Sequence, residues 1–238
     1  MANEIKLDFY NEDGSLKPFS EFSSELESIY KQLEQTSGNQ FMMYLTSPRN
    51  DFEPAQIINK FHFLDRKLYL NTEITETIAQ DFLEKIQFWN AEDDFNETSD
   101  DDRGVIQLFI NSPGGDLYAT MQIVDTILNS KTPVVTIVTG MAYSGGFLIA
   151  IAGDHRMAFP HATFMFHEGS NMVIGDAHKT LQQSDFYKNM LKQMKKYVLD
   201  RTKIDPSVYD SHQKDDWYFT VNQALKHGVI DEICTEIG

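Results

Sequence analysis

The middle of the chain alternates short apolar runs, glycine-rich segments and amphipathic stretches. Residues 105–110 and 134–139 are rich in β-branched and aromatic side chains and predict two buried strands. Each run is followed by a glycine-rich turn, at 111–115 or 140–146, and then by an apolar helical pattern. Because strand, turn and helix recur twice in this order, the pattern predicts parallel strands in an α/β fold.

Two other segments have the periodicity of amphipathic helices. After a strand pattern at 68–70, large apolar residues recur at intervals of three or four: Ile74, Ile78, Phe82, Ile86 and Trp89. This spacing predicts a helix whose N-cap is Thr72 or Thr75. The second segment, at about 176–200, has an apolar face made of Leu181, Phe186, Met190, Leu191, Met194 and Val198. We expect that face to pack against the rest of the chain or against another subunit.

Acidic residues are concentrated between Glu92 and Asp102. Seven of these eleven residues are acidic, and the segment has no apolar periodicity. We interpret it as an exposed, solvated loop, and a cation site or a partner surface is the alternative. The first 60 residues mix short helical patterns with turn signals, and the pattern does not indicate their role.

The composition excludes several classes of protein. Hydrophobic residues make up 41% of the 238, which is enough for a packed core. Lys and Arg number 20 against 36 Asp and Glu, and the net charge of −16 would repel a nucleic-acid backbone. The single cysteine, Cys234, excludes an internal disulfide and a thiolate metal site. We therefore expect no metal, no nucleic-acid partner and a reducing compartment.

Membrane insertion and export are also disfavoured. The segment 132–153 has no charge over 22 residues, which is long enough to cross a bilayer, but Pro133 and four glycines interrupt it. The first residues, Met-Ala-Asn-Glu-Ile-Lys, carry charges where a signal peptide is apolar. We therefore expect a cytoplasmic protein without a membrane partner.

The two glycine-rich turns carry the residues best suited to chemistry. Both follow buried strands, so they lie at the carboxyl edge of the predicted sheet, where α/β folds place their sites. Ser144 stands between strand and helix, with its hydroxyl near the helix N-terminus. Gly114 and Gly115 let a backbone amide approach a ligand. A serine beside such amides suits acyl transfer, although a serine between glycines is also common in ordinary turns.

A serine nucleophile needs a base, and His167 directly follows the strand pattern at 163–166. A structural histidine at a strand end is the alternative, and the residues alone leave both interpretations open. Neither G-x-G-x-x-G nor G-x-x-x-x-G-K-[ST] occurs, so we expect no dinucleotide site, no ATP site and no cofactor.

Three segments resemble the ClpP family, the proteolytic subunits of caseinolytic protease, in order and spacing. They are Phe-Ile-Asn-Ser-Pro-Gly-Gly at 109–115, Gly-Met-Ala-Tyr-Ser-Gly-Gly-Phe-Leu at 140–148 and Phe-Met-Phe-His at 164–167. The likeness extends from Leu64 to Ile233 and includes the closing Ala-Leu-Lys-His-Gly-Val-Ile-Asp at 224–231.

The resemblance implies a serine endopeptidase with a Ser-His-Asp triad. The positions of nucleophile, general base and acid are occupied by Ser144, His167 and Asp216. Asp215 is the adjacent alternative for the acid. Gly115 and Gly145 occupy the positions whose backbone amides form the family's oxyanion hole.

The resemblance also implies a fold and an assembly. The fold is the ClpP/crotonase-type spiral of parallel strand-turn-helix units, with a protruding handle helix at about 176–200. It would span 61–238 with an acidic insert at 92–102, preceded by an N-terminal extension at 1–60. Family members form heptameric or stacked rings that hydrolyse peptides or unfolded proteins without a cofactor, and an AAA+ unfoldase is a possible partner.

The chain departs from the family pattern at two places. Asp215 stands where many members have an arginine used in pairing between rings. The segment after His167 lacks the usual Pro and Gly-Gly, and the chain is similar to divergent, phage-encoded or accessory members. A crotonase-type acyl-CoA enzyme and an inactive ring subunit are the alternatives. The complete set of Ser144, His167 and Asp216 argues against both.

Overall fold

The computed structural model describes residues 59, 61–169 and 176–235. Apart from residue 59, the extension expected at 1–60 lies outside these residues, and the elements described below belong to the unit Phe61–Gly238. In the described part of the chain, no helix combines the length and the apolar character that crossing a membrane requires. The uncharged segment 132–153 instead forms a strand, a turn and a short helix.

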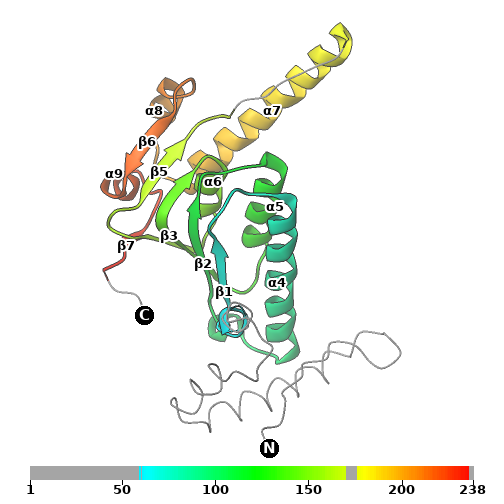
Figure 1. Cartoon of the computed structure of the whole chain (residues 1–238), viewed down its shortest axis with the longest axis vertical. Helices are drawn as coiled ribbons and strands as arrows, with labels where there is room; N and C mark the ends of the chain where they lie inside the picture. The colour runs from blue at the N-terminus through cyan, green and yellow to red at the C-terminus, as the bar shows by residue number, and fades with distance from the viewer. Residues whose placement is uncertain (1–58, 60, 170–175, 236–238) are drawn as a thin grey trace, which may run out of the picture. The chain divides into compact units, whose positions relative to one another are not determined.

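Within the described residues, a seven-stranded sheet forms the centre of this unit (Figure 1). Its strands are β1 (Lys67–Leu70), β2 (Ile106–Ser112), β3 (Val134–Tyr143), β4 (His155–Ala158), β5 (Thr163–Phe166), β6 (Trp217–Thr220) and β7 (Glu232–Ile233). The order is β1-β2-β3-β4-β7, and all of these neighbours are parallel. β5 runs parallel to the end of β3, and β6 is antiparallel to β5. This parallel sheet with helices confirms the predicted fold class.

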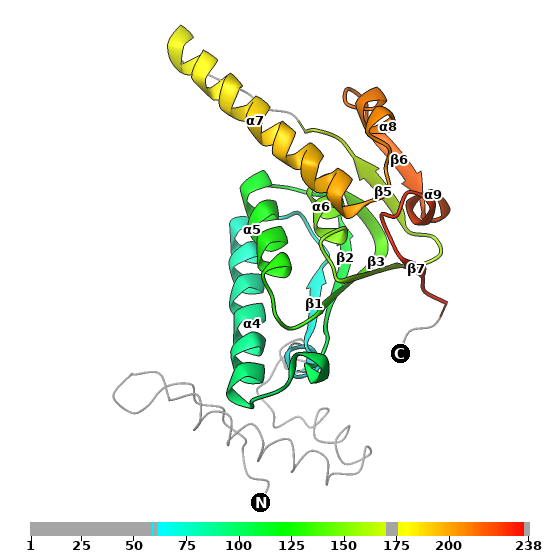
Figure 2. The same cartoon turned by 180° about the vertical axis from the view of Figure 1, so that it is seen from behind.

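The helices follow the strands as the pattern predicts. They are α4 (Glu76–Phe95), α5 (Leu117–Leu128), α6 (Gly145–Ala150), α7 (Ala177–Arg201), α8 (Pro206–Ser211) and α9 (Val221–Lys226), with a 3-10 turn η1 (Asp100–Asp102). Thr75, and not Thr72, is the N-cap of α4, because its side chain accepts a hydrogen bond from the Ile78 amide. α4 and α5 lie side by side on one face of the sheet (Figures 1 and 2).

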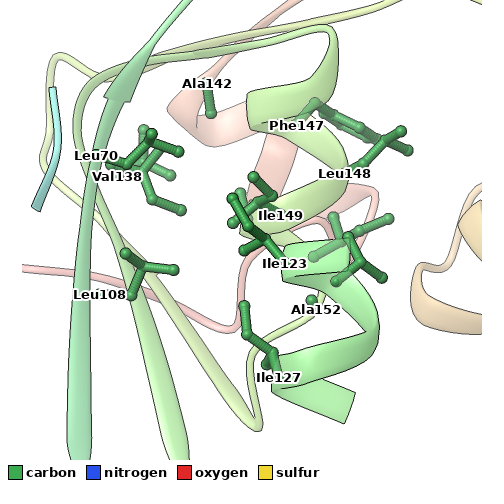
Figure 3. Packing of buried hydrophobic residues seen from close by; sticks show 14 of the residues in the cluster. Leu70, Leu108, Ile123, Ile127, Val138, Ala142, Phe147, Leu148, Ile149 and Ala152 are labelled. Atoms are coloured by element: carbon green, nitrogen blue, oxygen red, sulfur yellow. The ribbon is translucent and has the colours of Figure 1, made fainter. Parts of the chain in front are cut away.

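Apolar side chains fill the space between the sheet and the helices α5 and α6 (Figure 3). The residues that meet there, each at most 2% exposed, are Leu70, Leu108, Ile123, Ile127, Val138, Phe147 and Ile149. Burial of a large aliphatic or aromatic side chain stabilises a fold by roughly 1.5–3 kcal/mol. This packing holds α6 against the sheet directly after Ser144.

β3 is longer than the sequence predicts. It continues to Tyr143, so most of the turn predicted at 140–146 is extended chain. The amide of Met141 donates to the Asn111 side chain at 3.2 Å, and β5 pairs with Met141–Tyr143. Tertiary hydrogen bonds therefore overcome the local turn preference of Gly140, and the turn contracts to Ser144.

The acidic segment 92–102 is also not the uniform exposed loop that was predicted. α4 continues through its first residues, and Asp93 is only 4% exposed. The Asp93 carboxylate accepts hydrogen bonds from Arg66 at 2.7 and 2.8 Å and from the Thr132 hydroxyl at 2.6 Å. Burial by itself would raise the pKa of Asp93, but these hydrogen bonds and the Arg66 charge lower it. The prediction was wrong for Asp93 because Arg66, which lies 27 positions earlier in the chain, neutralises its charge.

α7 extends away from the sheet (Figure 2), close to the predicted range of 176–200. Asp176 caps its N-terminus by accepting a hydrogen bond from the Lys179 amide at 3.0 Å. Met194 and Val198, near its C-terminus, are buried against the rest of the unit. None of the side chains at 178–193 is buried. Only the C-terminal part of the predicted apolar face therefore packs on this chain.

Candidate active site

Two adjacent parallel strands bring Ser144 next to His167. Ser144 directly follows β3, and His167 directly follows β5. In the register of these strands Tyr143 is opposite Met165, and the Ser144 amide donates to the Met165 carbonyl at 2.8 Å. The pairing of β3 with β5 therefore brings together two side chains that are 23 positions apart in the sequence.

The backbone of Ser144 has a conformation that is unusual for a residue with a side chain. Its φ is 53° and its ψ is −117°, and it is the N-cap of α6. Such a conformation costs on the order of 1–3 kcal/mol and persists where the surrounding packing enforces it. Phe147, one turn later, is fully buried and holds α6 in place. The sharp bend presents the hydroxyl at the strand–helix junction.

Ser144, His167 and Asp216 form a continuous chain of hydrogen bonds. Ser144 Oγ lies 2.8 Å from His167 Nε2, and His167 Nδ1 lies 3.1 Å from Asp216 Oδ1. The Asp215 carboxylate makes no hydrogen bond or ion pair among the described residues. The Asp216 side chain is 55% exposed and that of His167 is 31% exposed. The carboxylate end of this chain of hydrogen bonds is therefore exposed to solvent.

β6 positions Asp216. This strand pairs with β5 in antiparallel register, with Trp217 opposite Phe166. In that register Asp216 is opposite His167, whereas Asp215 is one step further from it. The strand was not predicted, although Trp-Tyr-Phe-Thr at 217–220 is a run of strand-forming residues that indicates it.

An aromatic cluster connects the three segments that carry these side chains. The Phe147 ring lies 5.3 Å from the Phe166 ring and 5.9 Å from the Phe219 ring, between centroids. Phe147 lies in α6, which begins directly after Ser144, and Phe219 lies in β6, which begins directly after Asp216. Phe166 directly precedes His167. All three rings are buried, so one packed group fixes the relative positions of the three segments.

The two predicted glycine turns meet beside Ser144. A Cβ atom on Gly114 would lie 2.8 Å from the Ser144 Cβ, and one on Gly115 would lie 2.3 Å from the Ile74 carbonyl oxygen. Gly145 is equally confined, because its Cβ would lie 2.4 Å from Thr120 Oγ1. Within the described residues, the amides of Gly115 and Gly145 have no hydrogen-bond partner. The close packing therefore requires glycine and leaves two amides available.

Comparison with known proteins assigns the chain to a family. The family model described as Clp protease matches residues 50–237. The chain belongs to the Clp protease family. This membership separates it from crotonase-type enzymes, which were an alternative from the sequence.

Curated members of the family share about 30% of their residues with this chain. ATP-dependent Clp protease proteolytic subunit 1 of Shouchella clausii is 32% identical over 175 residues, covering 71% of this chain and 84% of the relative. Subunit 1 of Mycobacterium leprae is 31% identical over 173 residues, covering 72% and 82%. Subunit 2 of Mycolicibacterium paratuberculosis is 31% identical over 196 residues, covering 82% and 94%.

In this member of the Clp protease family, a cleft of about 570 Å³ opens over Ser144 and His167. Its lining includes the backbone of both glycine turns. Its apolar lining residues include Leu117, Leu148, Phe186, Met190 and Met194. Among the described residues, no group of three or more His, Cys, Asp or Glu side chains is arranged to hold a metal ion. The groups at the cleft that suit acyl transfer are the Ser144 hydroxyl, the His167 imidazole and the backbone amides of Gly115 and Gly145.

Proposed function

We propose that the chain is the catalytic subunit of a Clp-type serine endopeptidase, with Ser144 as nucleophile, His167 as general base and Asp216 as the acid of the triad. The observation that carries the proposal is the continuous chain of hydrogen bonds from Ser144 through His167 to Asp216 at the cleft. The relatives named as Clp protease proteolytic subunits support the same activity.

Each group has a defined role in the reaction. His167 Nε2 takes the proton of the Ser144 hydroxyl while Oγ bonds to the carbonyl carbon of the peptide bond, and Asp216 stabilises the imidazolium. The Gly115 and Gly145 amides donate to the resulting oxyanion. Collapse of this intermediate breaks the C–N bond, and the imidazolium protonates the leaving amine. Water then repeats the sequence on the acyl-enzyme and releases the acid product and free Ser144.

The cleft indicates the preferred peptide. Leu148, Met190 and Met194 present apolar and flexible side chains close to Ser144. Such a lining favours an apolar side chain next to the scissile bond and tolerates several shapes of it. The substrate class we propose is therefore peptides and unfolded proteins cleaved after apolar residues.

The proposal includes assembly into a homo-oligomer, as a heptameric ring or stacked rings in the cytoplasm. Leu181 and Phe186 of α7 are 64% and 59% exposed. Phe186 also lines the cleft, and the exposed Leu181 fits contact with another subunit. The relatives are named as subunits of an ATP-dependent protease, so an AAA+ unfoldase is the proposed partner for folded substrates.

A fluorophosphonate tests the nucleophile directly. We expect intact-mass analysis to show one phosphonyl adduct per subunit, located on Ser144, and no adduct in Ser144→Ala. The matched control is Ser211→Ala, which removes an exposed hydroxyl of α8 that donates to the Val208 carbonyl, and it should be labelled like the wild type. Labelling that persists in Ser144→Ala would remove Ser144 from this role.

A further inference from the structure

Glu168, the residue directly after His167, is held at two points by tyrosine hydroxyls. Tyr187 of α7 donates to the Glu168 carbonyl oxygen at 3.0 Å. Tyr209 of α8 donates to the Glu168 carboxylate at 3.4 Å. The chain just beyond the imidazole is therefore tied to two helices that follow it in the sequence.

Tyr209 also contacts the residue on the other side of His167. Tyr209 is 1% exposed, and its ring lies 5.3 Å from the Phe166 ring, between centroids. The Lys195 ammonium of α7 lies 5.5 Å from the Tyr209 ring centroid and pairs with Asp210. One tyrosine thus holds both flanks of His167 at the place where α7 and α8 meet.

The partial burial of Glu168 makes the hydrogen bond from Tyr209 important for its carboxylate. Burial raises the pKa of Glu168, the Tyr209 hydrogen bond and Lys195 act against that rise, and Asp210 adds to it. A partly buried carboxylate that loses a donor is left with an unmet desolvation cost. The Tyr209 hydroxyl therefore stabilises the partly buried carboxylate of Glu168.

The same helix, α7, holds the segment that carries the serine. The Tyr197 hydroxyl donates to the Leu148 carbonyl of α6 at 2.9 Å, and Arg201 Nε donates to the Ile151 carbonyl at the end of α6 at 2.9 Å. α6 begins directly after Ser144. α7 therefore contacts both the serine segment and the histidine segment through side-chain donors.

We propose that Tyr209, supported by Tyr187, is a positioning residue that holds His167 at reacting distance from Ser144 through Glu168. The proposal rests on the proposed function of Ser144 and His167. The Tyr209 hydroxyl does not touch either of them, and it acts by fixing the end of β5 relative to α7 and α8. Small displacements of a base from its nucleophile have large effects on rate, because proton transfer needs a short and aligned hydrogen bond.

Tyr209→Phe isolates the hydroxyl, since the ring against Phe166 remains. We expect kcat for a short peptide to fall about tenfold while KM changes less than about twofold, because peptide contacts in the cleft are untouched. Fluorophosphonate labelling of Ser144 should slow by the same factor. Tyr187→Phe should act in the same direction, and because Tyr187 is partly exposed and lines the cleft, its labelling rate is the readout. The control is Tyr69→Phe, whose hydroxyl has no hydrogen bond among the described residues and whose ring stacks on Phe109.

A double-mutant cycle tests the connection through the carboxylate. Glu168→Ala alone should lower kcat as Tyr209→Phe does, and Glu168→Gln, which keeps an acceptor for the hydroxyl, should restore most of it. In the Tyr209→Phe background, Glu168→Ala should cost little more, because the hydrogen bond is already absent. Fully additive effects would overturn the proposal.

The outcomes separate this inference from the proposed function. If the wild type is not labelled at Ser144, the proposed function fails. If the wild type is labelled but both Tyr→Phe variants keep the wild-type kcat and labelling rate, the positioning role fails. Sedimentation checks the assembly of each variant. A lower kcat explained entirely by lost assembly, with normal labelling per assembled subunit, would also overturn the positioning role.

Discussion

At the scale of single residues, two neighbouring aspartates show how position decides a role. Asp215 and Asp216 have the same side chain, and both are exposed. Only Asp216 lies within hydrogen-bond distance of His167, at 3.1 Å, because β6 begins at the next residue and pairs with β5. A carboxylate there selects the imidazole tautomer that leaves Nε2 free to accept the serine proton.

We therefore expect Asp216→Asn to reduce kcat by about 10²–10⁴-fold, because an amide can hold the wrong imidazole tautomer and cannot stabilise an imidazolium. Asp215→Asn, an identical change one residue away, should leave kcat within about twofold. Steady-state kinetics on one fluorogenic peptide compares them. The assignment would be reversed if Asp215→Asn proved to be the damaging change.

At the scale of secondary-structure elements, an ion-pair group ties the end of α4 to the start of β1. Arg66, directly before β1, binds Asp93 with two hydrogen bonds and also pairs with Glu92 at 2.8 Å. The Arg66 and Asp93 side chains are 16% and 5% exposed, so solvent screens this pair weakly. Thr132, just before β3, adds a third attachment through its hydroxyl.

Asp93→Asn should lower the free energy of urea unfolding at pH 7 by about 2 kcal/mol, because Arg66 loses its most buried carboxylate partner and keeps Glu92 and the Gly104 carbonyl. Since the pKa of Asp93 is lowered by folding, its contribution is present above the ordinary aspartate pKa of ~3.9 and is lost as the pH falls through the lowered folded value. The difference between wild type and variant should therefore shrink on acidification.

The matched control for this prediction is Asp101→Asn in the same acidic segment. Its carboxylate is exposed and has no hydrogen bond or ion pair among the described residues. We expect a change below about 0.5 kcal/mol at every pH. A difference for Asp93→Asn that stays constant from pH 7 to acid would show that charge is not the cause.

At the scale of the whole molecule, charge and assembly act together. The chain carries a net charge of −16, and a ring of identical chains would multiply this field. A chamber formed by such a ring would attract cationic peptides and repel acidic ones before any contact with Ser144. The effect decreases as salt shortens the screening length from about 30 Å at 0.01 M to about 10 Å at 0.1 M.

A basic and an acidic fluorogenic peptide of equal length, with the same residues at the scissile bond, separate steering from chemistry. We expect a higher kcat/KM for the basic peptide at low ionic strength and convergence of the two values in high salt. Both peptides should have similar kcat, since the cleft contacts are the same. Equal kcat/KM at low ionic strength would exclude steering by the net charge.

Features that depend on short stretches of chain can be inferred from the order of the residues. The apolar periods predicted the α/β class, the helix capped by Thr72 or Thr75 and the long helix near 176–200, and the structure contains all three, with Thr75 as the cap. Local propensity and capping act between residues a few positions apart, so they can be inferred from the order of side chains alone. The motif segments around Ser144 and His167 also indicated the family before any fold was available.

Features that depend on pairing between distant segments follow only from the folded chain. The register of β6 against β5 separates Asp216 from Asp215, and β5 extends β3 through a predicted turn. Arg66 binds the buried Asp93, which lies in a segment that the sequence predicts to be solvated. Tyr209 binds Glu168, which is 41 positions away in the sequence. No local pattern encodes such contacts, because their free energy arises only when the sheet and helices are packed together.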